Sequence, residues 1–374
     1  MFRQERRELV LRKNSKIVIA AALVIVLAGT GIYAGYLLSS PGSPCGPSAS
    51  AAQSGAPDAT EAESPSNYDT PSQSSSPTAP VQTPAAHIRS SAASNPGEVI
   101  NVVAAENFWG SLVSQIGGIH VNVTSIVTDP NTDPHEYQAN DSDAKAISAA
   151  RYVIVNNVGY DGWATQLIGA DGNANQTILN VGDSLGVRVT GGIVTGNPHL
   201  WYNPAYVNDT VAWMFHNLTS IAPGLTGYFT SQYDNVTASL GSLYSRVTQI
   251  KDQFAGAEVA STESIFVYLA NATDLDLVSP PAFMEAIAEG SDPSDASEVQ
   301  FECQLESGNV KVLVYNEQTV TPITTNMKAI AAEHNVTTMF VTETIQPPNV
   351  SFQTWMMGEL DSLQDALNAN ALGE

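Results

Sequence analysis

The chain has 374 residues, of which 43% are hydrophobic and 14% are charged, and its formal net charge is −23. This length and apolar content suffice for one large or two medium-sized domains with a hydrophobic core. Nucleic-acid binding needs clustered Lys and Arg to meet the phosphates, so we expect no nucleic-acid partner for so acidic a chain.

The few basic residues are concentrated at the N-terminus. Six of the 14 Lys and Arg residues lie in residues 1–16, and residues 17–38 that follow carry no charge and are rich in Ile, Val, Ala and Leu. An apolar run of this length can span a bilayer as a helix, and flanking cations favour the cytoplasmic side. We predict a cytoplasmic basic segment at 1–16 and a transmembrane anchor at 17–38. A cleaved signal segment and a lipidated Cys45 are the alternatives.

Residues 39–98 have a different composition. They hold 10 of the 21 prolines, together with many Ser, Thr, Ala and Gln and very few Val, Ile or Leu residues. Such a segment buries too little apolar surface to offset its ordering entropy, so we predict a disordered Pro/Ser/Thr-rich stalk. Nine Asn-x-Ser/Thr triplets, which permit glycosylation, all lie beyond the stalk. They begin at Asn122, Asn140, Asn175, Asn208, Asn217, Asn235, Asn271, Asn335 and Asn349. We therefore expect an extracytoplasmic glycoprotein at the cell surface, tethered to the cell membrane by its N-terminal segment.

From Val99 onward, short apolar runs alternate with segments of helical period. This alternation predicts an α/β fold with mainly parallel sheets covered on both faces. In chain order, the expected strands are Val99–Ala105, Val121–Val127, Tyr152–Val158, Val259–Ser261, Val310–Tyr315 and Thr338–Val341. The expected helices are Phe108–Ile116, Ser142–Ala150, one from Ile265, Ile323–Glu333 and Phe352–Leu367. We predict two α/β lobes, at residues 99–225 and 257–374.

A long helix is expected between the lobes. Apolar residues recur at steps of three and four from Phe229 to Phe254, which is typical of one amphipathic helix. We predict a single rigid linking helix at residues 226–256, which would restrict hinge motion between the lobes.

Two of the six histidines have a distinctive context. His135 and His199 each follow a proline, in loops that we expect after strands of the first lobe. Open α/β sheets bind ligands at the carboxyl ends of their strands, so this pair suggests imidazole ligands to a metal in the cleft. We interpret His120, His216 and His334 as structural or exposed, and His87 lies in the stalk.

Four sequence blocks then resemble a known family. The blocks are 133–137 (DPHEY), 197–201 (NPHLW), 262–269 (TESIFVYL) and 342–345 (TETI), the last followed by 352–356 (FQTWM). In this order they resemble the cluster A-I solute-binding proteins, the zinc and manganese receptors of metal ABC transporters. The resemblance extends over nearly all of the chain after the stalk.

The resemblance implies that His135, His199, Glu263 and Glu343 are metal ligands in an interlobe cleft. Two neutral imidazoles and two carboxylates suit a first-row divalent cation, and the two negative charges offset its charge. The chain departs from the family at Asn197, where Asp is frequent, and at Glu343, where many members have Asp. Glu263 as third ligand favours Mn²⁺, whereas the general affinity order favours Zn²⁺, so both metals stay open.

By resemblance, the chain is expected to be a monomeric receptor, not an enzyme, that captures Zn²⁺ or Mn²⁺. It would deliver the ion to an ABC permease and its cytoplasmic ATPase. A metal-stabilised surface adhesin is the first alternative, since the stalk suits display. A surface metallohydrolase is a weaker one, because catalytic zinc sites usually have three protein ligands and an open position for water.

Overall fold

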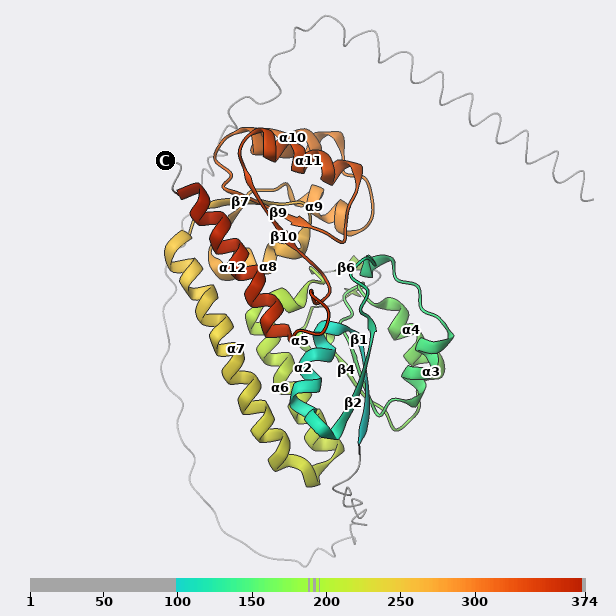
Figure 1. Ribbon diagram of the computed structural model, residues 1–374. Coiled ribbons are helices and arrows are strands. Elements are labelled where there is room, and N and C mark those ends of the chain that lie inside the picture. The colour runs from blue at the N-terminus through green and yellow to red at the C-terminus, as the bar shows by residue number, and fades with distance from the viewer. Residues whose placement is uncertain (1–98, 188, 191–192, 195, 372–374) are drawn as a thin grey trace, which may run out of the picture. The chain divides into compact units, whose positions relative to one another are not determined.

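The computed structural model describes residues 99–187, 189–190, 193–194 and 196–371 (Figure 1). The predicted basic segment at 1–16, the anchor at 17–38 and the stalk at 39–98 lie outside the described residues. Within the part of the chain that is described, no helix combines the length and the apolar character needed to cross a membrane.

The first lobe is built on a parallel four-stranded sheet of order β2-β1-β3-β4. Its strands are β1 (Ile100–Glu106), β2 (Val121–Val127), β3 (Tyr152–Val155) and β4 (Thr177–Asn180). Its helices are α2 (Asn107–Gly117), α3 (Asp141–Ala149), α4 (Gly162–Asp171), α5 (Val181–Leu185) and α6 (Pro204–Ile221). A short antiparallel pair, β5 (Val189–Thr190) and β6 (Ile193–Val194), precedes α6.

The second lobe repeats this plan with a parallel sheet of order β10-β9-β7-β8. Its strands are β7 (Glu258–Ser261), β8 (Asp276–Leu277), β9 (Val312–Asn316) and β10 (Thr337–Val341). Its helices are α8 (Val267–Thr273), α9 (Pro281–Ala288), α10 (Asp295–Glu306), α11 (Pro322–Glu333) and α12 (Phe352–Ala371). The two sheets confirm the predicted class of two α/β lobes with parallel strands.

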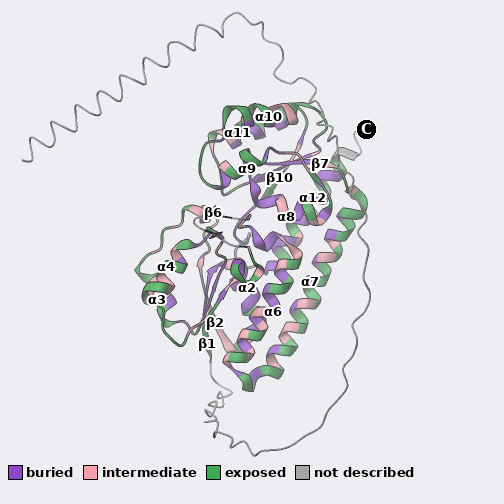
Figure 2. Ribbon diagram, turned by 180° about the vertical axis from the view of Figure 1, so that it is seen from behind, coloured by how far each residue is buried: buried purple, intermediate pink, exposed green. Residues whose placement is uncertain are grey.

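Helix α7 (Thr226–Phe254) lies between the lobes in the chain and has 29 residues. Its buried face is the apolar stripe that the sequence predicts, and it packs against α2 and α6 of the first lobe and α8 of the second (Figure 2). Helix α12 runs beside α7 and also contacts both α2 and β10. Helix α7 therefore joins the lobes along the chain, and α12 packs across both of them.

Strand β3 is shorter than predicted. It ends at Val155, because Asn157 and Val158 have φ values of 64° and 59°, in the left-handed region that a strand cannot contain. The Asp161 carboxylate closes this turn by accepting hydrogen bonds from the backbone N–H groups of Asn156 and Asn157, both at 2.6 Å. The turn places Tyr160 at the carboxyl end of the sheet.

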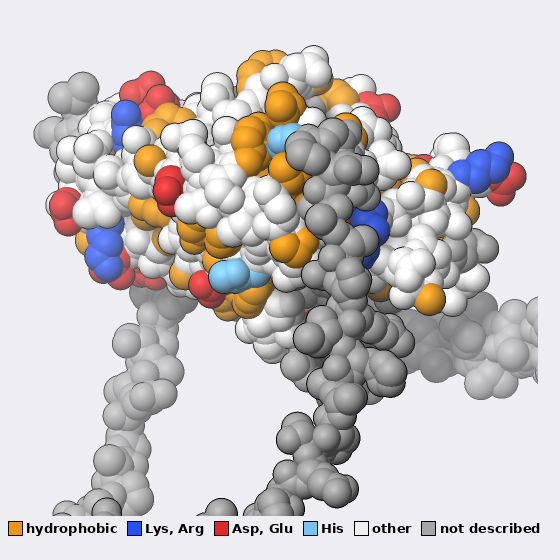
Figure 3. Space-filling view, turned by 90° about the horizontal axis from the view of Figure 1, so that it is seen from below, with side chains coloured by type: hydrophobic (Ala, Val, Ile, Leu, Met, Phe, Trp, Pro, Cys, Tyr) orange, Lys and Arg blue, Asp and Glu red, His pale blue; other side chains and the backbone are white. Residues whose placement is uncertain are grey.

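Charged side chains of both signs are scattered over the surface. On the face seen from below, Lys and Arg side chains occur in separate small groups, several of them beside Asp or Glu (Figure 3).

Candidate metal centre

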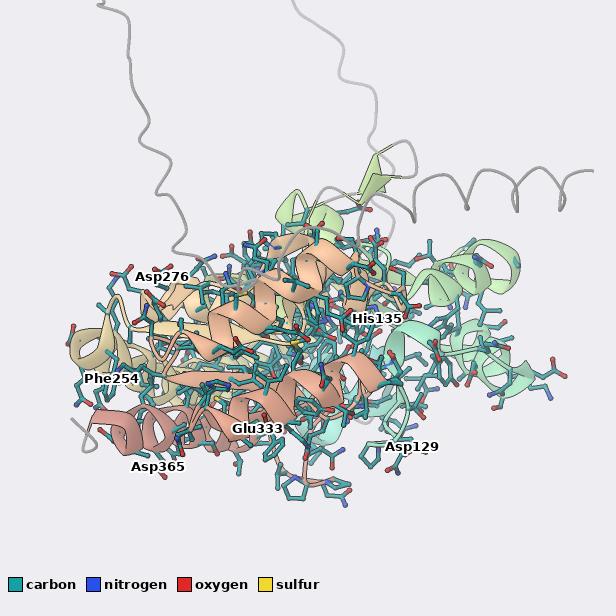
Figure 4. The ribbon with its side chains drawn as sticks, turned by 90° about the horizontal axis from the view of Figure 1, so that it is seen from above. Asp129, His135, Phe254, Asp276, Glu333 and Asp365 are labelled. Carbon is teal, nitrogen blue, oxygen red and sulfur yellow. The ribbon has the colours of Figure 1, made fainter. Side chains whose placement is uncertain are left out.

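The four residues singled out by the sequence lie together between the lobes. His135, His199, Glu263 and Glu343 each offer one ligand atom, and these atoms all lie within 4.8 Å of one another. In the view from above, His135 lies where the ribbons of the two lobes meet, whereas Phe254 and Asp365 mark the far ends of α7 and α12 (Figure 4). The sequence therefore identifies a true spatial cluster.

The carboxyl ends of parallel strands supply most of this cluster. His135 follows β2, Glu263 follows β7 and Glu343 follows β10. His199 is different, because it follows the antiparallel strand β6 and not a strand of the main sheet. Both sheets thus direct their carboxyl ends at one point, as expected for ligand sites in open α/β folds.

Each histidine is held by a polar side chain two residues before it. The Asp133 carboxylate accepts a hydrogen bond from the His135 N–H at 2.9 Å and caps a 3-10 turn, Pro134–Glu136. Asn197 Oδ1 accepts from the His199 backbone N–H at 2.9 Å. In both motifs the proline at the intervening position fixes φ, and the capping side chain fixes the turn. The local sequence thereby fixes the backbone position from which each imidazole side chain projects.

The second contact of Asn197 determines the protonation of the His199 ring. Asn197 Oδ1 lies 2.7 Å from His199 Nδ1, and the Asn197 Nδ2 group donates to the backbone carbonyl of Ser264. Because Nδ2 is engaged as a donor, the oxygen faces the ring, and His199 Nδ1 must carry the hydrogen. His199 Nε2 is then directed at the cluster and supplies a lone pair when the ring is neutral, which is the arrangement that metal-bound histidines use.

Three separations within the cluster are close to those of a metal site. His199 Nε2 lies 3.1 Å from Glu263 Oε1 and 3.4 Å from His135 Nε2, which itself lies 3.3 Å from Glu343 Oε2. Bonds of about 2.0–2.1 Å to a tetrahedral zinc ion would separate neighbouring ligand atoms by about 3.3–3.4 Å. The side chain of His135 is 15% exposed and the other three are fully buried. One divalent cation would therefore fit among these atoms.

The charges of the cluster are strongly coupled. Burial alone would lower the pKa of His135, but the Glu343 and Glu263 carboxylates and Asp133 outweigh it and raise that pKa to about 9. Burial would likewise raise the pKa of Glu343, but His135 and His199 hold it well below its ordinary value. The Glu343 carboxylate thus remains charged and attracts a positive charge into the cluster, either protons on the imidazoles or a metal ion.

One oxygen of the cluster is buried without a hydrogen bond. Glu263 Oε1 is buried and has no hydrogen-bond partner, although its neighbour Nε2 of His199 is only 3.1 Å away. A buried carboxylate oxygen without a partner costs free energy, and two facing lone pairs repel each other. A divalent cation between the four atoms would pair with this oxygen and remove the repulsion between the lone pairs. The donor set therefore fits a metal ion.

Sequence reasoning did not identify two further residues of the site. Asn316, the last residue of β9, is fully buried and donates through Nδ2 to Glu263 Oε2 at 3.0 Å and to Glu343 Oε1 at 2.8 Å. The Tyr160 hydroxyl donates to Glu343 Oε2 at 2.8 Å. Burial, and then the Glu343 carboxylate, raise the pKa of Tyr160 well above its ordinary value, so this hydroxyl keeps its proton. A single polar residue ending an apolar strand is the only sequence signal for Asn316.

A cleft of about 920 Å³ leads to the exposed side of the cluster. His135 and Asn197 lie on its wall, together with the acidic residues Asp133, Glu136 and Glu285. A cleft with carboxylates on its wall favours the entry of cations over anions.

Comparisons with known proteins agree with this geometry. The family described as "Zinc-uptake complex component A periplasmic" matches residues 102–366. The manganese-binding lipoprotein MntA of Halalkalibacterium halodurans is 24% identical over 192 residues, which are 50% of this chain and 61% of that relative. This chain therefore matches less than two thirds of that curated relative.

Solved structures show the same fold. The periplasmic zinc-binding protein TroA from Treponema pallidum aligns with a TM-score of 0.61 at 14% identity, over 72% of this chain and 99% of that one. The laminin-binding protein Lmb of Streptococcus agalactiae, described as bifunctional with adhesin and metal-transporting activity, aligns with a TM-score of 0.60 at 17% identity. That alignment covers 72% of this chain and 99% of that one. Since the family match covers well over half of the chain, the chain belongs to the family of the periplasmic component A of zinc-uptake complexes.

Proposed function

We propose that this chain is an extracytoplasmic receptor that binds one Zn²⁺ or Mn²⁺ ion through His135, His199, Glu263 and Glu343. It would pass the ion to an ABC permease driven by a cytoplasmic ATPase. Residues 1–38 would hold it at the membrane, as a monomer. Family membership and the metal-binding relatives support this role.

The observation that carries the proposal is the convergence of four ligand atoms, two imidazole nitrogens and two carboxylate oxygens, within 4.8 Å of one another. Glu263 Oε1, which is buried without a hydrogen bond and lies 3.1 Å from His199 Nε2, supports it. With both imidazoles neutral, the two carboxylates offset the charge of a divalent ion, so the closed site would bury no net charge.

Release of the ion would follow from separation of the lobes. The histidines belong to the first lobe and the glutamates to the second, so a small relative displacement would divide the ligands into two pairs. Helices α7 and α12 both contact the two lobes, which favours a small displacement over a wide hinge opening. A metal-free structure opened by several tens of degrees would contradict this part of the proposal.

Metal binding can be tested on the full chain purified in detergent micelles. We expect about one ion per chain by mass spectrometry, and loss of that ion in His135→Ala and Glu263→Ala. His216→Ala is the matched control, because His216 is on helix α6 and lies outside the cluster. Retention of a full equivalent of metal in both ligand variants would overturn the site.

Delivery needs a separate experiment. In cells that lack this chain, uptake of radioactive zinc or manganese from micromolar medium should fall, and the full chain but not Glu263→Ala should restore it. Unchanged uptake, with metal binding intact, would contradict delivery to an importer and favour a surface role in which the metal only stabilises the fold.

A further inference from the structure

The carboxylates of the two glutamates in the cluster are held in the same way. Each has one oxygen directed into the cluster and the other held outside it. Glu263 Oε1 faces His199 while Oε2 accepts a hydrogen bond from Asn316 at 3.0 Å. Glu343 Oε2 faces His135 while Oε1 accepts from Asn316 at 2.8 Å. One amide group therefore engages both carboxylates.

The orientation of Asn316 is fixed by the backbone. Its Oδ1 accepts a hydrogen bond from the Gln318 N–H at 2.9 Å, so its Nδ2 must face the glutamates. The two hydrogens of Nδ2 are shared among three acceptors, namely Glu263 Oε2, Glu343 Oε1 and the Thr319 hydroxyl oxygen. The Thr319 hydroxyl, 2.9 Å from Nδ2, donates to Glu343 Oε1 at 3.2 Å and reinforces the bond on that side.

This arrangement sets the number of donor atoms. While Asn316 holds Glu263 Oε2 and Glu343 Oε1 outside the cluster, each carboxylate directs only one oxygen at a metal. With two imidazole nitrogens the site then offers two nitrogens and two oxygens, the four-coordinate set that zinc accepts. Manganese is better served by more oxygen ligands in octahedral geometry, which bidentate carboxylates would provide.

We infer that Asn316 is a positioning residue that keeps both glutamates monodentate and thereby selects Zn²⁺ over Mn²⁺. The inference rests on the proposed function, because it concerns the same ligands. It concerns the choice between the two metals, which the ligand types alone leave open.

The test compares the affinities of the full chain for Zn²⁺ and for Mn²⁺, each by competition with a chelator, together with the coordination number of bound zinc by X-ray absorption. Loss of such a supporting partner typically weakens metal binding by about 10- to 100-fold. In Asn316→Ala we expect that loss for Zn²⁺, a smaller loss or a gain for Mn²⁺, and a zinc coordination number above four. The Zn²⁺/Mn²⁺ affinity ratio should therefore fall, by about 10- to 100-fold where the Mn²⁺ affinity does not change.

Asn107→Ala is the matched control. Asn107 accepts a hydrogen bond from the Ile345 N–H beside the Glu343 loop at 3.1 Å, and its removal should leave the affinity ratio unchanged. Thr319→Val is a milder second variant, in case Asn316→Ala does not fold, and should shift the ratio in the same direction by less.

The outcomes separate the two proposals. If the unmodified chain binds neither metal, the proposed function is wrong. If it binds one ion, and both Asn316→Ala and Thr319→Val keep the original affinity ratio and four-coordinate zinc, the role of Asn316 is wrong while the proposed function stands.

Discussion

Besides accepting the hydrogen bond from the His199 backbone N–H, the Asn197 side chain makes two connections that can be separated by substitution. Its oxygen holds His199 Nδ1 at 2.7 Å, and its Nδ2 group donates to the Ser264 carbonyl of the second lobe. Asn197→Ala removes both. Without the Nδ1 contact the imidazole loses its tautomer constraint, and we expect metal affinity to fall by about 10- to 100-fold. Each factor of ten corresponds to about 1.4 kcal/mol, so the loss is about 1.4–2.8 kcal/mol.

Asn197→Asp removes only the second connection. A carboxylate still accepts from His199 Nδ1–H, so the affinity should stay within a few-fold of the original. It cannot donate to the Ser264 carbonyl and places an oxygen against that carbonyl oxygen. The free energy of unfolding should therefore fall by about 0.5–1.5 kcal/mol, the typical contribution of one hydrogen bond, because the Ser264 carbonyl keeps the bond from the Val267 N–H.

Zinc titration with a competing chelator measures the first effect, and urea unfolding of the metal-free chain measures the second. If Asn197→Ala binds zinc with the original affinity, the orienting role of Asn197 is refuted. If Asn197→Asp loses as much affinity as Asn197→Ala, the tautomer argument fails, although the contact with the second lobe stays important.

Three further substitutions test other contacts. Tyr160→Phe removes the 2.8 Å bond to Glu343 Oε2, and we expect zinc affinity to drop about tenfold in chelator competition, with an unchanged value counting against a supporting role. Burial raises the pKa of Glu359 to about 8, against the opposing effect of bonds from Tyr202 and Thr342. A raised carboxyl pKa means that stability is greatest below the unfolded value near 4.5 and falls as pH rises to about 8. Glu359→Gln keeps a neutral group there, so its unfolding free energy relative to the original should increase over this pH range by an amount on the order of a few kcal/mol, and a difference independent of pH would refute the buried charge. Leu240→Ala truncates a fully buried side chain of α7 and should lower the unfolding free energy by about 2–5 kcal/mol in urea titration, whereas a loss below about 1 kcal/mol would show that this face is not tightly packed.

Much of the fold is encoded in local patterns. The apolar runs predicted Val121–Val127 as a strand with its observed bounds, and the step of three and four from Phe229 predicted α7. Strand β8 was not predicted, because a strand of two residues, Asp276 and Leu277, has no measurable period. The packing of α12 across both lobes was also not predicted, since the packing partner of an amphipathic helix depends on tertiary structure.

The residues of the site also divide into those with a local sequence signal and those without one. His135 and His199 are marked by proline-histidine loops, and the glutamates were found only through a family resemblance. Asn316 carries no such mark. Its importance arises from contacts with Glu263, 53 positions earlier, and Glu343, 27 positions later, which no local pattern contains. Polar partners of a ligand are visible in a sequence only when the turn that presents them has a signature of its own.

The spread of the cluster along the chain has a consequence for the order in which the protein folds. From His135 to Glu343 the cluster spans more than 200 positions, and each lobe contains only two of its four members. A chain whose second lobe is still being synthesised or exported can offer the two imidazoles alone, which bind a divalent ion weakly. Metal would therefore be captured late, after both lobes have folded and docked. Because a ligand stabilises only the state that binds it, the ion would shift the equilibrium toward the completed molecule and not toward its intermediates.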